Sequence, residues 1–126
     1  LPQVEPEIRH FFLDGVYMRQ LYIPKGHALT GKVHTAESYS IILKGDISVV
    51  NDENISTRLM QGDIVYSKPG SKKAGYAHDD TLFLTVHKVT TKSCIENIEA
   101  IEDELSASTF EEYTNKLSQQ LKLGAA

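Results

Sequence analysis

Tryptophan and cysteine are nearly absent from this chain of 126 residues, which contains no tryptophan and a single cysteine, Cys94. One cysteine excludes an internal disulfide framework, and such scarcity is typical of a reducing compartment. The sequence also has no apolar run near the roughly 18 residues that a membrane-spanning helix needs. Its first segment, LPQVEPEIRH, lacks the apolar core of a signal peptide. We therefore expect a cytoplasmic protein that has no membrane partner.

Basic residues are not in excess, since the chain has 13 Lys and Arg against 17 Asp and Glu. Residues 1–92 are nearly balanced, with 11 basic and 10 acidic residues, whereas residues 93–126 have 2 and 7. Without a basic stripe to neutralise phosphates, nucleic acid is not an expected partner. We interpret the acidic residues near the C-terminus as a solvated helix face rather than as a surface for a basic partner.

The length of the chain predicts a single domain. Residues 1–15 contain Pro2 and Pro6 among charged residues, and they are expected to form a flexible lead. From residue 16 to residue 92, short segments rich in β-formers are separated by turn signals every eight to twelve residues or so. This pattern predicts an all-β sandwich or barrel.

From residue 93 onwards the apolar residues recur at helical spacing. The two predicted apolar stripes are Ile95, Ile98, Ile101 and Leu105, and then Phe110, Tyr113, Leu117 and Leu121. Capping-box spacing at Ser93–Glu96 and at Ser108–Glu111 marks two helix starts. We therefore expect a helical C-terminal extension over residues 93–122. Its stripes pack either on their own sheet or on a second subunit, and the expected assembly is a homodimer or a higher homo-oligomer.

Two segments carry glycines at characteristic spacing. The first, from Gly26 to Gly45, reads GHALTGKVHTAESYSIILKG, and the second, from Gly62 to His78, reads GDIVYSKPGSKKAGYAH. These segments resemble the two motifs of the cupin superfamily. The resemblance implies a cupin-type double-stranded β-helix, or jelly-roll barrel, over residues 16–92, followed by two α-helices. The stretches RHFFLDGVYMRQLYIPKGHALTGKVHTAES and YAHDDTLFLTVHK are also similar to small cupin-like proteins of bacteriophage and bacterial genomes. That similarity implies the host cytoplasm if the chain is phage-encoded.

The metal ligands that the cupin motifs usually carry are mostly replaced in this sequence. His34 matches one family histidine, but Lys32 and Lys73 stand in place of two others and Ser38 stands in place of the glutamate. Lysines at ligand positions would repel a divalent cation, which needs deprotonated ligands. The resemblance therefore implies the barrel more strongly than it implies a metal, and a family-type metal is not the favoured cofactor.

Alternate residues of a strand point to the same face, so positions 32, 34, 38 and 40 are predicted to share the barrel interior. The candidate ligand pocket consists of Lys32, His34, Ser38, Ser40, Lys73 and Tyr76. Its cations and hydroxyl groups suit a small anionic or hydroxylated molecule. In an enzymatic version, His34 is the base, Tyr76 or Tyr39 is the acid, and a lysine stabilises developing negative charge. Catalytic residues are not assigned.

Two other functions stay open at this point. A displaced metal site would form if His34, His78 and His87 converge, because three imidazoles suit zinc, iron or nickel. Otherwise His78 lies in an exposed turn and His87 lies at the barrel mouth. The second alternative is an oligomeric structural protein that uses the barrel as a scaffold and the helical extension as its interaction surface.

Overall fold

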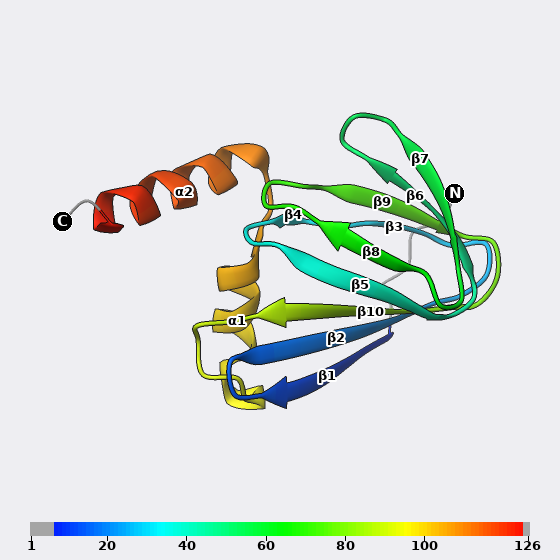
Figure 1. The fold of residues 1–126 in the computed structure, drawn as a ribbon, viewed down its shortest axis with the longest axis horizontal. Helices are drawn as coiled ribbons and strands as arrows, with labels where there is room; N and C mark the ends of the chain where they lie inside the picture. Colours follow the sequence, from blue (N-terminus) through cyan, green and yellow to red (C-terminus); the bar gives the residue numbers. More distant parts are fainter. Residues whose placement is uncertain (1–6, 125–126) are drawn as a thin grey trace.

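Two antiparallel β-sheets face each other in this protein (Figure 1). The computed structural model describes the backbone of residues 7–124 and the side chains of residues 7–119. The first sheet has five strands, in the order β1 (Glu7–Leu13), β2 (Val16–Ile23), β10 (Thr81–Lys88), β5 (Ser38–Lys44) and β8 (Ile64–Ser67). The second has four strands, in the order β3 (Ala28–Thr30), β9 (Lys73–Ala77), β6 (Asp46–Asn51) and β7 (Ser56–Met60).

A short two-stranded sheet and the helices complete the chain. Strand β4 (Val33–His34) pairs with β11 (Ser106–Ala107). The helical elements are a 3-10 turn, η1 (Ile95–Asn97), and the helices α1 (Ile98–Leu105) and α2 (Phe110–Gly124). The predicted all-β fold with two C-terminal helices is confirmed. Within the described residues, neither helix combines the length and the apolar character needed to cross a bilayer.

Strand β1 lies in the stretch that was expected to be a flexible lead, so that expectation is wrong for residues 7–13. All seven residues of β1 pair with β2, from Glu7↔Tyr22 to Leu13↔Val16. The turn between the strands is Asp14-Gly15, in which Gly15 has φ 73°. An Asp-Gly dipeptide between β-forming segments is a strong hairpin signal, and it outweighs the nearby prolines. Residues 1–6 of the predicted lead lie outside the described residues.

The inner face of the five-stranded sheet changes from apolar to polar along its strands. Three cross-strand rows, each read from β2 through β10 to β5, are Leu21–Phe83–Ile42, Arg19–Thr85–Ser40 and Tyr17–His87–Ser38. The apolar row joins the main core between the sheets, which contains Ile23, Ile47, Val49, Leu59 and Ala77. The polar rows lie towards the end of the barrel where β10 points to α1 (Figure 1).

Helix α1 packs on its own barrel at this polar end. Its buried residues Ile101 and Leu105 form a second core with Tyr17 and Val89. The Glu104 carboxylate holds the helix in place, because it accepts hydrogen bonds from the N–H groups of Thr90 and Thr91 (both 2.7 Å) and from the Thr91 hydroxyl (2.6 Å). The alternative that stayed open for the apolar stripe of this helix is thus settled in favour of its own barrel.

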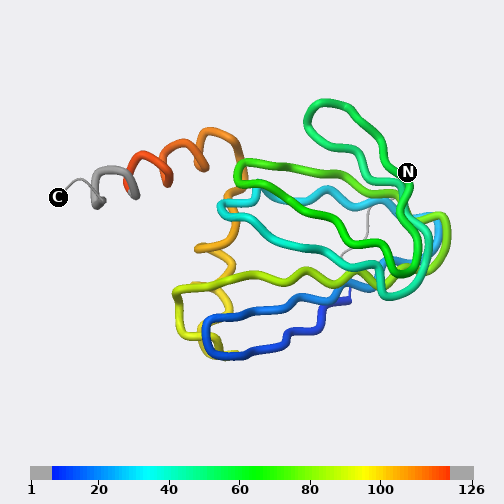
Figure 2. The backbone as a smooth tube through the Cα atoms, viewed as in Figure 1, coloured from blue at the N-terminus to red at the C-terminus, as the bar shows by residue number. Residues whose placement is uncertain are grey.

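Helix α2 extends away from the barrel, as both views of the chain path show (Figures 1 and 2). Near its start, Tyr113 lies over Gly70, where an added Cβ would be 3.1 Å from the tyrosine ring. The helix is capped one residue later than predicted: Thr109 Oγ1 accepts from Glu112 N–H (3.1 Å), and the Glu112 carboxylate accepts from Ser108 N–H (2.9 Å).

The other predicted capping box does not form. The hydroxyl of Ser93 instead donates to the carbonyl of Val16 at 2.6 Å, so Ser93 ties the start of the helical extension to β2.

Candidate functional site

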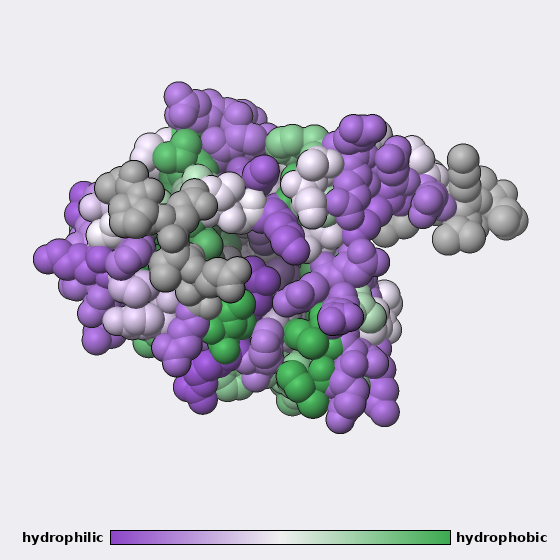
Figure 3. Space-filling model, turned by 180° about the vertical axis from the view of Figure 1, so that it is seen from behind, coloured by the Kyte–Doolittle hydropathy of each residue, from purple (hydrophilic) through white to green (hydrophobic). Residues whose placement is uncertain are grey.

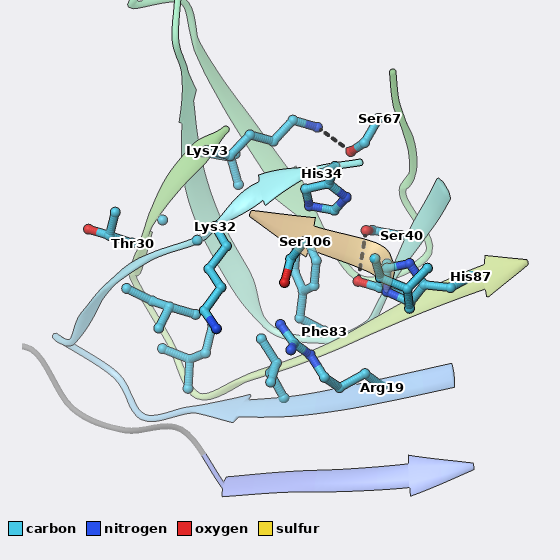
Figure 4. Close-up of a pocket in the computed structure, with 18 of the residues that line it drawn as sticks. Arg19, Thr30, Lys32, His34, Ser40, Ser67, Lys73, Phe83, His87 and Ser106 are labelled. Atoms are coloured by element: carbon cyan, nitrogen blue, oxygen red, sulfur yellow. Dashed lines mark hydrogen bonds between the residues drawn. The ribbon is translucent and has the colours of Figure 1, made fainter. Parts of the chain in front are cut away.

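A cavity of about 270 Å³ lies between the two sheets (Figure 4). Its apolar wall is made by Leu21, Ile23, Leu29, Ile47, Val49 and Phe83. Helix α1 and the segment after it close one side with Glu102, Leu105 and Ser106. The cavity thus has an apolar wall that belongs to the core and a polar part near α1.

Three cations reach the cavity from three different segments. Arg19 comes from β2, Lys32 from the segment between β3 and β4, and Lys73 from the start of β9. In Figure 4 the side chains of Arg19 and Lys32 point into the same space from opposite sides. Among the described residues that line the cavity, Glu102 is the only carboxylate. The cavity therefore has an excess of positive charge.

The charge on these cations is not neutralised by neighbouring carboxylates. The ion pairs formed within the described part of the chain involve none of the three. Lys73 Nζ instead donates a hydrogen bond to Ser67 Oγ at 2.8 Å. Burial lowers the pKa of Lys73 below its ordinary value, because a buried ammonium loses solvation. An anion in the cavity would give the Lys73 ammonium a favourable interaction that replaces part of its lost solvation.

Two imidazoles lie together in the polar part of the cavity. The ring centroids of His34 and His87 are 6.1 Å apart. His34 Nδ1 is 3.3 Å from Ser38 Oγ, and its backbone is fixed on both sides: His34 N–H donates to the Ser71 carbonyl (2.9 Å), and Gly70 N–H donates to the His34 carbonyl (2.7 Å). The ring of His87 stacks on that of Tyr17, with centroids 5.9 Å apart.

Both imidazoles are neutral at pH 7. Burial lowers the pKa of His87 to about 4, and the nearby His34 and Arg19 act in the same direction. The pKa of His34 is also lowered, first by burial and then by the charges of Lys73 and Arg19. Burial raises the pKa of Tyr17 to about 12. Its hydroxyl lies 2.6 Å from His10 Nδ1. Neutral imidazoles beside cations offer hydrogen-bonding groups without adding charge.

Four of the six residues of the predicted pocket line this cavity: Lys32, His34, Ser40 and Lys73. Ser38 is buried beside it and contacts His34. Tyr76 differs, because it does not line the cavity and its neighbours on β9, Gly75 and Ala77, point inward. The ring of Tyr76 contacts His78 instead (4.9 Å between centroids).

The predicted acids of an enzymatic version are therefore in the wrong place. Tyr76 points away from the cavity, and Tyr39 lies on the outer face of the five-stranded sheet, 56 % exposed. Tyr17 is the tyrosine that lines the cavity. The pairing of His34 with Tyr76 or Tyr39 as base and acid is thus not available.

The three histidines of the displaced metal site do not converge. His78 Nε2 is 2.6 Å from Ser48 Oγ, and Ser48 points outward because its neighbours Ile47 and Val49 belong to the core. No group of three or more His, Cys, Asp or Glu in the described residues is arranged to hold a metal ion. The residues at the family-type positions do not fit a metal either, since Lys32 and Lys73 reach the cavity as cations.

Sequence reasoning missed Arg19 and Glu102 as residues of the cavity. A signal for Arg19 is present in the segment VYMRQLYI. Period-two alternation places Arg19 on the face of Tyr17, Leu21 and Ile23, so a charge falls on an otherwise core-facing side. Glu102 has no such signal, because its place depends on how α1 packs against the barrel.

The comparisons with known proteins agree with this architecture. No protein-family profile matches the chain, and no curated protein matches it. A conserved protein with a double-stranded β-helix domain from Klebsiella pneumoniae superposes with a TM-score of 0.62 at 18% identity, over 70% of this chain and 75% of that chain. An RmlC-like cupin from Methanocaldococcus jannaschii gives 0.58 at 16% identity, over 67% and 80%. This chain has the cupin fold.

One similar structure is that of a protein with a stated activity. The DMSP lyase DddQ from Ruegeria pomeroyi gives a TM-score of 0.57 at 20% identity, and the match covers 69% of this chain and 49% of the lyase. Identities this low establish a common cupin fold and no common chemistry.

Proposed function

We propose that this protein binds a small organic anion in its cavity, with the anionic group near Arg19 and Lys32 and an apolar part against the core. The observation that carries the proposal is the charge of the lining: three cations, Arg19, Lys32 and Lys73, face a single carboxylate, Glu102. Cations held in a partly buried site favour an anion, because the loss of water strengthens their attraction for it.

The chemistry of the two parts narrows the class of ligand. Arg19 offers a planar fork that matches a carboxylate with two parallel hydrogen bonds. Leu21, Leu29 and Phe83 form an apolar surface on the other side, which suits a hydrocarbon portion better than a sugar. A cavity of about 270 Å³ lies just below the usual range of ligand sites. A short- or medium-chain carboxylate fits all three properties.

Calorimetric titration and thermal unfolding with a series of straight-chain carboxylates test the proposal, with the matching primary amides and alcohols as neutral controls. A carboxylate at 100 times its dissociation constant should stabilise the protein by about 2.7 kcal/mol, and the neutral analogues should not. Equal effects of acids and amides, or no effect of any carboxylate, would contradict the proposal.

Variants then locate the anionic group. Loss of one charge-assisted hydrogen bond in Arg19→Gln should weaken carboxylate binding about tenfold or more, and Lys32→Met should have a smaller effect in the same direction. The matched control is Lys88→Met, since Lys88 is an exposed cation of β10 that does not line the cavity. Weakening by the control as large as that by Arg19→Gln would assign the effect to net charge and not to the site.

A further inference from the structure

Lys73 differs from the other lysine of the cavity in its surroundings. Its side chain is half-buried, whereas that of Lys32 is exposed. Lys73 Nζ donates to Ser67 Oγ at 2.8 Å, and Ser67 is itself only 3 % exposed. In Figure 4 the side chain of Lys73 extends towards Ser67, while that of Lys32 extends towards Arg19. The amine of Lys73 is thus held inside the barrel by a neutral hydroxyl group.

Most other lysines in the described part of the chain have water or carboxylates around them. The face of the molecule seen in Figure 3 is largely hydrophilic, and its hydrophobic residues lie in separate patches. The exposed lysines are Lys25, Lys32, Lys44, Lys68, Lys88 and Lys92. Lys116 is half-buried, and it pairs with Asp103 and Glu112. Lys73 has less water around it than the exposed lysines, and it forms no ion pair within the described residues.

An amine in these surroundings is more reactive towards carbonyl groups than an exposed one. Burial lowers the pKa of Lys73, because the ammonium loses solvation that no carboxylate replaces. More of the side chain is therefore present as the neutral amine, which is the nucleophilic form. Desolvated lysines form imines with carbonyl compounds for this reason. Lys73 thus has the environment of a nucleophile as well as that of an anion-binding cation.

His34 lies between Lys73 and Arg19. Burial lowers the pKa of His34, and the charges of Lys73 and Arg19 act in the same direction, so the ring is near both cations. In Figure 4 the ring lies between their side chains. A ligand whose carboxylate is bound at Arg19 must therefore extend past the imidazole to reach Lys73 Nζ. Leu21 and Leu29 of the apolar wall suit a short hydrocarbon chain between the two ends of such a ligand.

We propose that Lys73 forms a protonated imine with the carbonyl group of an oxo acid bound in the cavity. This inference rests on the proposed function, because the carboxylate of the oxo acid is the anion bound near Arg19 and Lys32. The position of His34 adds that the carbonyl and the carboxylate are not adjacent. The substrate class is therefore a short oxo acid in which a hydrocarbon chain separates the two groups.

Formation of the imine requires no oxidant and no reductant. The neutral amine of Lys73 attacks the carbonyl carbon and forms a C–N bond, and the carbonyl oxygen takes a proton from the nitrogen. The C–O bond of this carbinolamine then breaks. Its oxygen takes the proton that the ammonium had released and leaves as water, and the nitrogen electron pair completes the C=N bond. In sum, one ammonium and one carbonyl group give one protonated imine and one water. His34 is the neutral base that carries protons between nitrogen and oxygen.

Reduction with sodium cyanoborohydride tests the proposal, because this reagent converts an imine into a stable secondary amine and leaves ketones intact. The probes are methyl-ketone acids, starting with levulinate, in which the chain between the two groups lengthens by one carbon at a time. Methyl ketones of the same length without the carboxylate are the neutral controls. Peptide mapping should find the label on Lys73, formed about tenfold or more faster with the best acid than with its control, because the anion site holds the carbonyl beside the amine.

Conservative variants separate the amine from its charge. Lys73→Arg keeps the positive charge and removes the nucleophile, so it should abolish labelling of this site and retain binding of simple carboxylates. Lys32→Arg and the exposed control Lys88→Arg should both be labelled on Lys73 as the wild type is. Far-UV circular dichroism checks that each variant is folded. No label on wild-type Lys73, or total labelling that Lys73→Arg leaves unchanged, would overturn the proposal.

The two proposals for the cavity fail in different ways. Binding of pentanoate in calorimetry without any label on Lys73 would overturn the imine and leave the anion site in place. Labelling of Lys73 at equal rates by acids and neutral ketones, without pentanoate binding, would overturn the anion site and with it the oxo acid as the substrate class. Arg19→Gln should lower the labelling rate with the acid towards that with the ketone, which ties the reactive amine to the bound carboxylate.

Discussion

Mild acid should destabilise this protein before its carboxylates protonate, and the reason is His87. The side chain is 8 % exposed, it stacks on Tyr17, and it faces His34. A proton on His87 would place a charge in a partly buried site next to Arg19. Burial accordingly lowers the pKa of His87 from 6.5 to about 4 in the folded state. The perturbation we consider is a fall in pH from about 7.5 to about 4.5.

The sign and the size of the effect follow from proton linkage. As the pH falls below 6.5 the unfolded chain takes up a proton on His87, while the folded chain stays neutral down to about 4. The stability that the neutral ring provides is therefore complete above pH 6.5 and is lost as the pH falls towards 4. The gap between the two pKa values corresponds to about 3 kcal/mol, and most of this stability is lost by about pH 4.5.

Urea unfolding at several pH values in this window measures the loss. The wild type should lose about 2–3 kcal/mol of unfolding free energy between about pH 7.5 and about pH 4.5. His34 adds to the loss, because its pKa is lowered too. His87→Gln, though less stable at neutral pH, should have a flatter dependence. Equal pH slopes for His87→Gln and the wild type, or an NMR titration of the His87 ring near its ordinary pKa, would refute the reasoning.

Three further predictions concern stability alone, and urea unfolding measures each. Gly45→Ala should lower the free energy of unfolding by more than about 2 kcal/mol, because φ at Gly45 is 113° and an added Cβ would lie 2.5 Å from atoms of Asp80 and Thr81. Gly62→Ala should lower it by less, because Gly62 has φ 91° but an added Cβ would lie in open space. Glu104→Ala should lower the free energy of unfolding by about 1–3 kcal/mol, since one exposed donor at Thr90 and two half-buried donors at Thr91 lose their acceptor. Arg58→Ala should cost less than about 1 kcal/mol, because its ion pair with Asp46 is exposed; a larger loss there would contradict the screening argument.

The inner lining of β5 could be predicted from sequence, because strand geometry is local. The alternation that places Ser38, Ser40 and Ile42 on one face needs only a regular strand, and the spacing from Gly26 to Gly45 indicated where that strand lies. The same argument places His34 near Ser38. Residues whose position depends only on one strand and its neighbour could thus be predicted from the sequence.

The residues that sequence reasoning misplaced depend on longer-range arrangements. Tyr76 was predicted to line the pocket and His78 to be a ligand of the displaced metal site, yet the parity of β9 turns Tyr76 outward, and His78 forms a hydrogen bond with Ser48 on that outer side. A shift of one residue in the assumed register reverses every side chain of a strand. Glu102 enters the cavity only because Ile101 and Leu105 dock α1 on Tyr17, and no local pattern specifies that docking.

The replaced metal ligands and the excess of cations are two aspects of one change in the cavity. A divalent metal brings two positive charges to the barrel interior, and Lys32 with Lys73 brings the same formal charge at positions where the cupin motifs have ligands. In the proposed function, these two lysines supply the attraction for an anion without a metal. Lysine side chains are flexible, and within the described part of the chain the hydrogen bond that holds Lys73 Nζ goes to Ser67 Oγ. Removal of Lys73 should therefore weaken the proposed anion binding rather than abolish it. Lys73→Met should retain measurable carboxylate affinity, reduced by less than in Arg19→Gln, whereas complete loss would indicate that Lys73 organises the site.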